Sequence, residues 1–414
     1  MAINLVEVAA ESIRIGVPLP FALRSEEGVL LANKGYVVGS REELETMLGR
    51  GLHFHVEAID LETSRRAYVG QLYDLVREEK PLGQIAGTGF DALVTHTRRN
   101  QEEEDDEEPD WLDMQEQVNT LLRDPEPAHF TNRVEQVIGR LLRYLQRNPD
   151  GALFALNYLS ASELQRYSAT HAMQVAAICY LTARDVLRWT PQEQTLVCHA
   201  ALTMNIAMVE LQDRLVRQAE QLSPGQRLDV QMHASRSCEM LRARGVTQPD
   251  WLEAVLHHHL AQPGPLEGRT TAERLARLIQ RADIFGAQLA PRVGRQSVTP
   301  AAAMQAMFFD ENKQVDAAGS ALIKAVGVYP PGTFVRLMNN ETAVVVRRGG
   351  NTNAPRVAVV LNREGMPTAE HAIRDTSQPD YRVAAGVEHR TIRIVLNLAK
   401  FLPLTLSTTA ARIG

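Results

Sequence analysis

The chain has 414 residues, of which 44% are hydrophobic and 23% charged, and its formal net charge is −6. This composition is typical of a globular protein of two or three domains and excludes a collagen-like or wholly disordered chain. A negative balance without clustered Lys and Arg argues against nucleic acid as a partner. No stretch approaches the roughly 20 apolar residues of a membrane span, so we expect a cytoplasmic protein.

The first 80 residues predict a small N-terminal α+β domain. PLPFALR and VLLANKG are strand-like runs around a turn at residues 26–28, and LHFHVE alternates with period two. Ser40 and Glu43 predict the capping box of a short helix that ends near Gly51. A second helix is expected at about residues 64–80.

Residues 81–110 predict an acidic flexible linker. The segment is rich in Gly, Thr and charge, and residues 102–108 are all acidic. Like charges at consecutive positions repel one another and keep a chain solvated. An interaction tail is the alternative interpretation of this acidic run.

Residues 111–326 predict an all-helical domain. Pro191 and Pro300 suit the first turn of a helix, and Thr190 and Thr299 before them are suitable N-caps. Apolar residues with helical spacing predict helices at residues 130–147, 164–187, 191–215, 228–244, 250–259, 271–289 and 300–317.

Residues 327–414 predict a β-rich C-terminal appendage. TFVRLMNN and TAVVVRR are strand-like runs separated by a turn, and PRVAVVLN follows Gly349 and Gly350. The apolar stretch TIRIVLNLAKFLPLTL carries no assignment. The expected fold class is therefore mainly α, with a helical domain between a small α+β domain and this β-rich appendage.

Histidines lie on apolar helix faces. His258 shares a face with Trp251 and Val255, His259 lies beside it, and His257 points elsewhere. Two adjacent inward imidazoles are unusual because a buried polar group needs a partner. Histidines whose hydrogen bonds are satisfied within the core are the alternative to metal ligands.

Other helices repeat this feature. His171, His233 and Asp283 each lie on a predicted core stripe, whereas His199 lies near a helix edge and is expected to be structural. Together with the paired histidines, these helices offer imidazoles and one carboxylate to a common interior. Such a ligand set suits divalent Fe, Mn or Zn.

With these positions marked, residues 164–331 resemble the HD-GYP family, metal-dependent phosphodiesterases that cleave the bacterial messenger cyclic di-GMP. THAMQVA, LSPGQRLDVQMHASRSCEML, LHHHL and RADIFGAQLAPRVGR are similar in order and spacing to the family's motifs. VYPPGTFVRLMNNETAVVV resembles the β appendage that often follows that domain. The resemblance implies that the helical domain is HD-type. The metal ligands that it implies are His171, His233, His258, His259 and Asp283.

The chain differs from the family's pattern at positions that carry the family's chemistry. Where the family has a run such as ALLHDIGK, this chain reads AALTMNIAM, so Met204 and Asn205 replace the His-Asp dyad and Met208 replaces the Lys. Leu260 and Tyr167 replace two acidic residues, and the Tyr of GYP is missing. A neutral amide cannot bridge two cations with a full negative charge, and a thioether is a poor ligand for Fe or Mn.

The resemblance implies further residues and partners. Arg292 and Arg295 match basic residues that contact the ligand's phosphates in the family, with ordinary surface arginines as the alternative. His233, His258 and His259 could still form a site for one residual divalent metal ion, Fe, Mn or Zn, unless Met204 and Met208 fill the space as core.

We therefore expect a catalytically impaired regulatory or binding module in bacterial cyclic di-GMP signalling. Its expected partner is cyclic di-GMP or a signalling protein such as a diguanylate cyclase. An active phosphohydrolase with a reduced metal site and a purely structural interaction module are the two alternatives.

Overall fold

The computed structural model describes residues 109–124, 129–291 and 298–406, together with short stretches of the first 57 residues. The chain forms two compact units, Met1–Glu108 and Pro109–Gly414. The finer division near residues 80, 110 and 326 stays a prediction. Within the described residues, no helix has both the length and the apolar character that a membrane span requires.

The first unit contains a four-stranded antiparallel sheet in the order β1-β4-β2-β3. Its β2, β3 and β4 confirm the three predicted strand regions, whereas β1 was not predicted. The Glu43 amide donates a hydrogen bond to Ser40 Oγ at 3.1 Å, as the predicted N-cap requires. Most of that helix, the helix predicted at 64–80 and the acidic linker lie outside the described residues. The strands are β1 (Leu5–Val8), β2 (Leu23–Arg24), β3 (Leu30–Ala32) and β4 (Phe54–Glu57).

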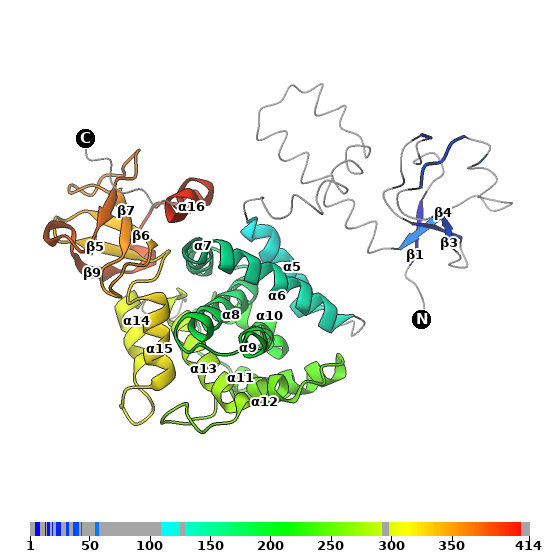
Figure 1. Cartoon of the computed structure of the whole chain (residues 1–414), viewed down its shortest axis with the longest axis horizontal. Helices are drawn as coiled ribbons and strands as arrows, with labels where there is room; N and C mark the ends of the chain where they lie inside the picture. Colours follow the sequence, from blue (N-terminus) through cyan, green and yellow to red (C-terminus); the bar gives the residue numbers. More distant parts are fainter. Residues whose placement is uncertain are drawn as a thin grey trace. The chain divides into compact units, whose positions relative to one another are not determined.

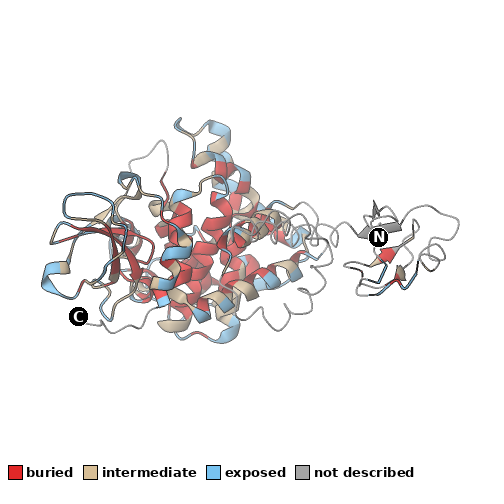
Figure 2. Cartoon of the chain, turned by 90° about the horizontal axis from the view of Figure 1, so that it is seen from above, coloured by how far each residue is buried: buried red, intermediate tan, exposed pale blue. Residues whose placement is uncertain are grey.

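The second unit is mainly helical, and α8 runs through its middle (Figure 1). Figure 2 shows that the buried residues concentrate in these helices. From Tyr167 to Ala183 every residue of α8 is buried, because α5, α7, α9, α13 and α15 surround it. The helices are α5 (Trp111–Arg123), α6 (Phe130–Arg147), α7 (Pro149–Ser162), α8 (Tyr167–Asp185), α9 (Pro191–Thr203), α10 (Val209–Leu215), α11 (Pro224–Ala243), α12 (Pro249–His257), α13 (Thr271–Leu289), α14 (Pro300–Phe308), α15 (Ala317–Val326) and α16 (Leu398–Leu406).

Two predicted helix starts are confirmed by their caps. Thr190 Oγ1 accepts a hydrogen bond from the Glu193 amide, and the Glu193 carboxylate accepts one from the Thr190 amide, which completes a capping box. Thr299 Oγ1 accepts from the Ala302 amide at the start of α14. Both caps satisfy amide groups that a helix leaves free at its first turn.

The helix predicted at residues 191–215 is interrupted, so this prediction was wrong. The segment forms α9, a short 3-10 helix at Ile206–Met208 and then α10. The chain turns at Asn205, whose carbonyl accepts a hydrogen bond from the Met208 amide. Asn favours such turns because its short polar side chain competes with helical backbone bonds. Both helical pieces bury an apolar face, so the hydrophobic spacing did not reveal the break.

The helix predicted at residues 300–317 was also too long. It ends at Phe308, and Phe309 pairs with Val315 in an isolated β-bridge. Between them, Asp310 Oδ1 accepts hydrogen bonds from the amides of Asn312 and Gln314, which closes a turn. An aspartate that binds nearby amides in this way favours a turn over a continuing helix.

The C-terminal part of the second unit is a five-stranded antiparallel sheet in the order β8-β7-β6-β5-β9. The three predicted strand regions are confirmed as β5, β6 and β7. Phe334 and Val344 pack with Phe154 and Tyr158 of α7 and with Phe401 of α16, which joins the sheet to the helices. The strands are β5 (Phe334–Leu337), β6 (Thr342–Arg347), β7 (Arg356–Leu361), β8 (Ile373–Asp375) and β9 (Val383–Val387).

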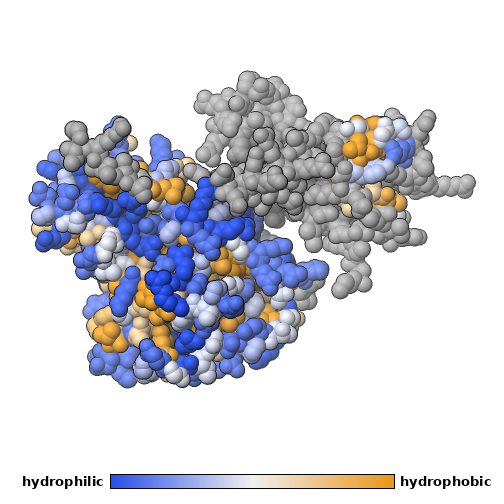
Figure 3. Space-filling view, in the orientation of Figure 1, coloured by the Kyte–Doolittle hydropathy of each residue, from blue (hydrophilic) through white to orange (hydrophobic). Residues whose placement is uncertain are grey.

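The face of the described part that Figure 3 shows is mainly polar. Figure 3 shows hydrophilic residues over most of the face in view, with apolar residues gathered in separate patches between them. Scattered apolar patches of this kind are ordinary on a folded protein.

Candidate functional site

Three histidines come together where α11 meets the end of α12. His233 lies on α11, and His258 and His259 directly follow α12. One ring nitrogen from each histidine lies within 4.8 Å of those of the other two. His233 and His258 are buried, whereas His259 is exposed. The structure therefore brings three of the five predicted metal ligands into one cluster, which we call the histidine trio.

Hydrogen bonds to the main chain fix the orientation of two of these rings. His233 Nδ1 lies 2.6 Å from Val230 O, and His258 Nδ1 lies 2.6 Å from Val255 O. A carbonyl oxygen can only accept a hydrogen bond, so each Nδ1 carries a proton and donates it. In a neutral ring the other nitrogen, Nε2, then presents a lone pair. Histidines that bind a metal ion usually donate a hydrogen bond in this way from the ring nitrogen that does not bind the ion.

The two lone pairs face each other. His233 Nε2 and His258 Nε2 are 3.2 Å apart, a repulsive contact unless a proton or a metal ion lies between them. Burial is the main cause that lowers the pKa of His258 to about 3, and burial also lowers the pKa of His233. Both shifts disfavour an added proton near neutral pH. The arrangement therefore fits a metal cation better than a shared proton.

The spacing also fits a single metal ion. Two nitrogens bound to one tetrahedral Zn at its usual bond length lie about 3.3 Å apart, close to the 3.2 Å between His233 Nε2 and His258 Nε2. His259 can supply a third nitrogen, and its exposure leaves the outer side of the site open. The trio would thus hold one ion through three imidazoles.

The other two predicted ligands form a pair. His171 Nε2 on α8 lies 2.7 Å from Asp283 Oδ1 on α13. Burial alone would raise the pKa of Asp283, but the hydrogen bond from His171 and the nearby imidazoles of His258 and His259 hold it well below its ordinary value. Asp283 is therefore ionised, and His171 Nε2 donates the proton in this bond.

Tyr167 extends this pair. Its hydroxyl lies 3.3 Å from His171 Nδ1, and its ring stacks on the His171 ring. With its proton on Nε2 facing Asp283, an uncharged His171 ring would accept a hydrogen bond from the Tyr167 hydroxyl through Nδ1. Tyr167, which stands where the family has an acidic residue, is fully buried and serves as a hydrogen-bond partner of His171.

Met204 and Asn205 stand where the resemblance places the His-Asp dyad. Met204 is completely buried in the helical core. Asn205 is also buried, and its Oδ1 has no hydrogen-bond partner within the described residues. The Ala207 amide donates to Ser237 Oγ at 3.2 Å, which ties this turn to α11 one helical turn beyond His233. A neutral amide oxygen cannot supply the charge that bridges two cations, so these residues fit one ion and not a bridged pair.

The remaining predicted residues fall into three groups. Leu260 is exposed, and His257 is half-buried outside the trio. His199 stacks on Trp251, and its buried Nε2 has no partner within the described part of the chain. The two arginines predicted to contact phosphate, Arg292 and Arg295, lie outside the described residues.

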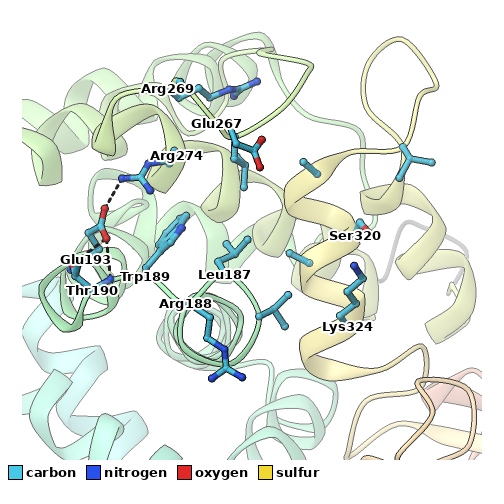
Figure 4. A pocket seen from close by; sticks show the side chains of 16 residues that line it. Leu187, Arg188, Trp189, Thr190, Glu193, Glu267, Arg269, Arg274, Ser320 and Lys324 are labelled. Atoms are coloured by element: carbon cyan, nitrogen blue, oxygen red, sulfur yellow. Dashed lines mark hydrogen bonds and ion pairs between the residues drawn. The ribbon is translucent and has the colours of Figure 1, made fainter.

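A pocket of about 770 Å³ lies elsewhere, between the α8–α9 loop, the loop before α13, and α15 (Figure 4). Trp189, Arg274 and Lys324 are among its lining residues, and none of the five predicted metal ligands lines it. Arg274 is already engaged, because it forms an ion pair with Glu193 at 2.5 Å and lies over the Trp189 ring. The pocket is therefore separate from the histidine trio.

One curated relative supports the resemblance. No family model matches the chain. It is 25% identical over 254 residues to the cyclic di-GMP phosphodiesterase PA4108 of Pseudomonas aeruginosa, and the match covers 59% of each protein. The match thus spans less than two thirds of that relative's length. A solved structure, Bd1817, a HDG"Y"P protein from Bdellovibrio bacteriovorus, shares 13% identity and a TM-score of 0.43, covering 78% of this chain and 99% of that one. The motif order and the curated relative therefore support the resemblance of the helical part of the chain to the HD-GYP family.

Proposed function

We propose that the chain is a catalytically impaired HD-GYP protein that acts as a regulatory or binding module in cyclic di-GMP signalling. The burial of Met204 and Asn205 at the dyad positions is the observation that supports this most. Hydrolysis of a phosphodiester near neutral pH needs a metal-bound hydroxide and neutralisation of the phosphate charge. Neither Met204 nor Asn205 can bridge two ions. The metal centre that would supply the hydroxide and neutralise the phosphate charge is therefore incomplete.

The histidine trio would hold one divalent ion in this proposal. Such an ion would supply a Lewis acid with a position open to solvent. Val230 O and Val255 O hold the His233 and His258 rings in the orientation that this requires. Asp283 accepts a hydrogen bond from His171, so this carboxylate has a hydrogen-bond partner without a second ion.

Cyclic di-GMP is the ligand that we propose, because the curated relative bears the name of a cyclic di-GMP phosphodiesterase. Arg292 and Arg295 are the proposed phosphate contacts, since a guanidinium group binds phosphate oxygens in a planar, two-pronged geometry. The proposed protein partner is a signalling enzyme such as a diguanylate cyclase, and the proposed location is the cytoplasm.

A functioning phosphohydrolase with a reduced metal site is the second candidate. The observation that favours it is the 3.2 Å spacing of His233 and His258 together with the exposure of His259, which leaves one side of the ion's site open. One Zn with three imidazoles and an open position is a known catalytic arrangement.

A calorimetric titration with cyclic di-GMP, followed by chromatography of the sample, separates these candidates. If the chain is a binding module, we expect it to bind cyclic di-GMP and the dinucleotide to be recovered intact. The Arg292→Ala/Arg295→Ala variant should bind cyclic di-GMP more weakly. Linear dinucleotide or GMP in the recovered sample would favour the hydrolase. Absence of binding by the unaltered chain would contradict the proposed ligand.

A further inference from the structure

A buried polar path runs from Gln174, one helical turn beyond His171 on α8, to the C-terminal sheet. Gln174 Nε2 of α8 donates to Asn157 Oδ1 of α7 at 2.7 Å, and Asn157 Nδ2 donates to Pro331 O at 2.7 Å. Gln174 is completely buried, and Asn157 nearly so. Buried polar side chains are costly unless they are paired, so this path specifies one arrangement of the three segments that it joins.

Gln174 lies next to the His171–Asp283 pair because helices α8 and α13 approach each other closely. A Cβ atom at Gly286 of α13 would lie 2.8 Å from Gln174 Oε1 and 3.1 Å from two atoms of the His171 ring. Gln174 is three residues after His171, and Gly286 is three residues after Asp283, so each lies one turn along its helix from the pair. The position of the Gln174 amide thus bears directly on the distance between α8 and α13.

The path reaches the sheet through an equally close approach. Gly332 has a φ of 88°, and a Cβ atom there would lie 2.5 Å from Phe154 O and 3.0 Å from Asn157 Cβ. The Gly332 amide donates to Val345 O at 2.8 Å, which joins this segment to β6. A shift of the sheet relative to α7 must therefore move Pro331 and Asn157.

We propose that Gln174 is a positioning residue that makes the geometry of the His171–Asp283 pair depend on how the C-terminal sheet docks on α7. A partner that moves the sheet alters the geometry of the His171–Asp283 pair through Asn157 and Gln174. In the other direction, a change at this pair alters the docking of the sheet on α7. Coupling of this kind is reciprocal by thermodynamic necessity. It requires no metal ion or nucleotide, so it goes beyond the proposed function and does not rest on it.

Hydrogen exchange of the full chain tests this coupling. The perturbation is the double variant His171→Ala/Asp283→Ala, which leaves no unpaired charge at the site. The readout is the exchange of the Gly332 and Val345 amides, each bonded within the sheet's entry segment. Rates are taken relative to the amides of α6, so that a general loss of stability cancels. We expect the double variant to speed relative exchange of these amides by at least about tenfold.

The double variant is also made in chains that carry a further substitution, to show whether its effect on amide exchange depends on Gln174. Gln174→Met keeps the length of the side chain and removes its hydrogen bonds, and in this background the double variant should add nothing. Gln115→Met is the matched control, because Gln115 is also completely buried and donates to Thr170 Oγ1 of α8 at 2.6 Å. In that background the full effect should persist. Asn157→Ala removes the middle residue of the same path and should reproduce the result of Gln174→Met.

Two outcomes would overturn the proposal. One is that the double variant leaves the relative exchange of Gly332 and Val345 unchanged. The other is that its effect remains additive in the Gln174→Met and Asn157→Ala backgrounds. Neither outcome touches the proposed function, because no ligand is present in the experiment.

Discussion

His233 Nε2 and His258 Nε2 face each other at 3.2 Å, while the Nδ1 atom of each ring donates to a main-chain carbonyl. Neither nitrogen of the facing pair has a proton to donate in its neutral ring, so the contact is favourable only with a cation between them. This relationship makes the trio the best candidate for metal binding among the described residues.

Replacement of a trio member should abolish metal binding. We expect one Zn ion per chain by equilibrium dialysis and elemental analysis, and His233→Ala or His258→Ala should weaken its affinity more than about 100-fold. His257→Ala is the control, because His257 neighbours His258 and lies outside the trio. Equal loss in the control, or no loss in the two variants, would contradict the assignment.

Restoration of the dyad should create a second metal position. In the Met204→His/Asn205→Asp variant, a carboxylate stands at the proposed bridging position, so we expect metal stoichiometry to rise from one ion to two. Without metal, the new buried charge should lower the free energy of urea unfolding by about 1 to 3 kcal/mol. Restored stability on addition of Mn would show that the charge is neutralised by an ion. A stoichiometry that stays at one would contradict this prediction.

A methyl group at Gly286 should force α8 and α13 apart. A Cβ atom there would meet Gln174 Oε1 and the His171 ring at 2.8 and 3.1 Å, so Gly286→Ala should destabilise the fold by about 1 to 3 kcal/mol. Gly139→Ala in α6 is the control, since its Cβ would meet no atom closer than 3.9 Å. That variant should gain about 0.5 to 1 kcal/mol because Ala favours a helix. Equal effects on urea unfolding would contradict the close approach.

Much of the helical fold could be predicted because its helices carry both a cap and an amphipathic pattern. Helix α13 follows the Thr270–Glu273 capping box and was predicted with the observed bounds, 271–289. In contrast, α7 was not predicted, because residues 151–160 are all buried and leave no polar face to set the period. Helix α16 was left unassigned, and it contains Pro403, which is unfavourable inside a helix.

The candidate site could be predicted in part. The LHHHL motif and the stripe positions identified the residues that form the trio and the His171–Asp283 pair. The link through Gln174 was not predicted, although Gln174 is three residues after His171, because an amide neither titrates nor is a usual metal ligand. Its partners Asn157 and Pro331 come from distant parts of the sequence, so only the tertiary structure brings them together.

Acid should weaken the fold through His389. Its ring packs against Tyr158 and Phe334, and burial lowers its pKa from 6.5 to about 4. Between these values the unfolded chain takes up a proton that the folded chain does not, so stability is lost as pH falls from about 6.5 to 4. His389→Phe should reduce this loss by about 2 kcal/mol in urea unfolding, with little change in slope above pH 7. Identical pH dependence in both proteins would contradict the burial of a neutral ring.

We propose that the site cannot hydrolyse cyclic di-GMP, its proposed ligand. The most direct test is a cyclic di-GMP hydrolysis assay on the full chain, reconstituted anaerobically with Fe or Mn, with products separated by chromatography. We expect intact cyclic di-GMP after prolonged incubation. Catalytic appearance of linear dinucleotide or GMP, which His233→Ala abolishes, would contradict the claim and show that a site without the His-Asp dyad supports hydrolysis.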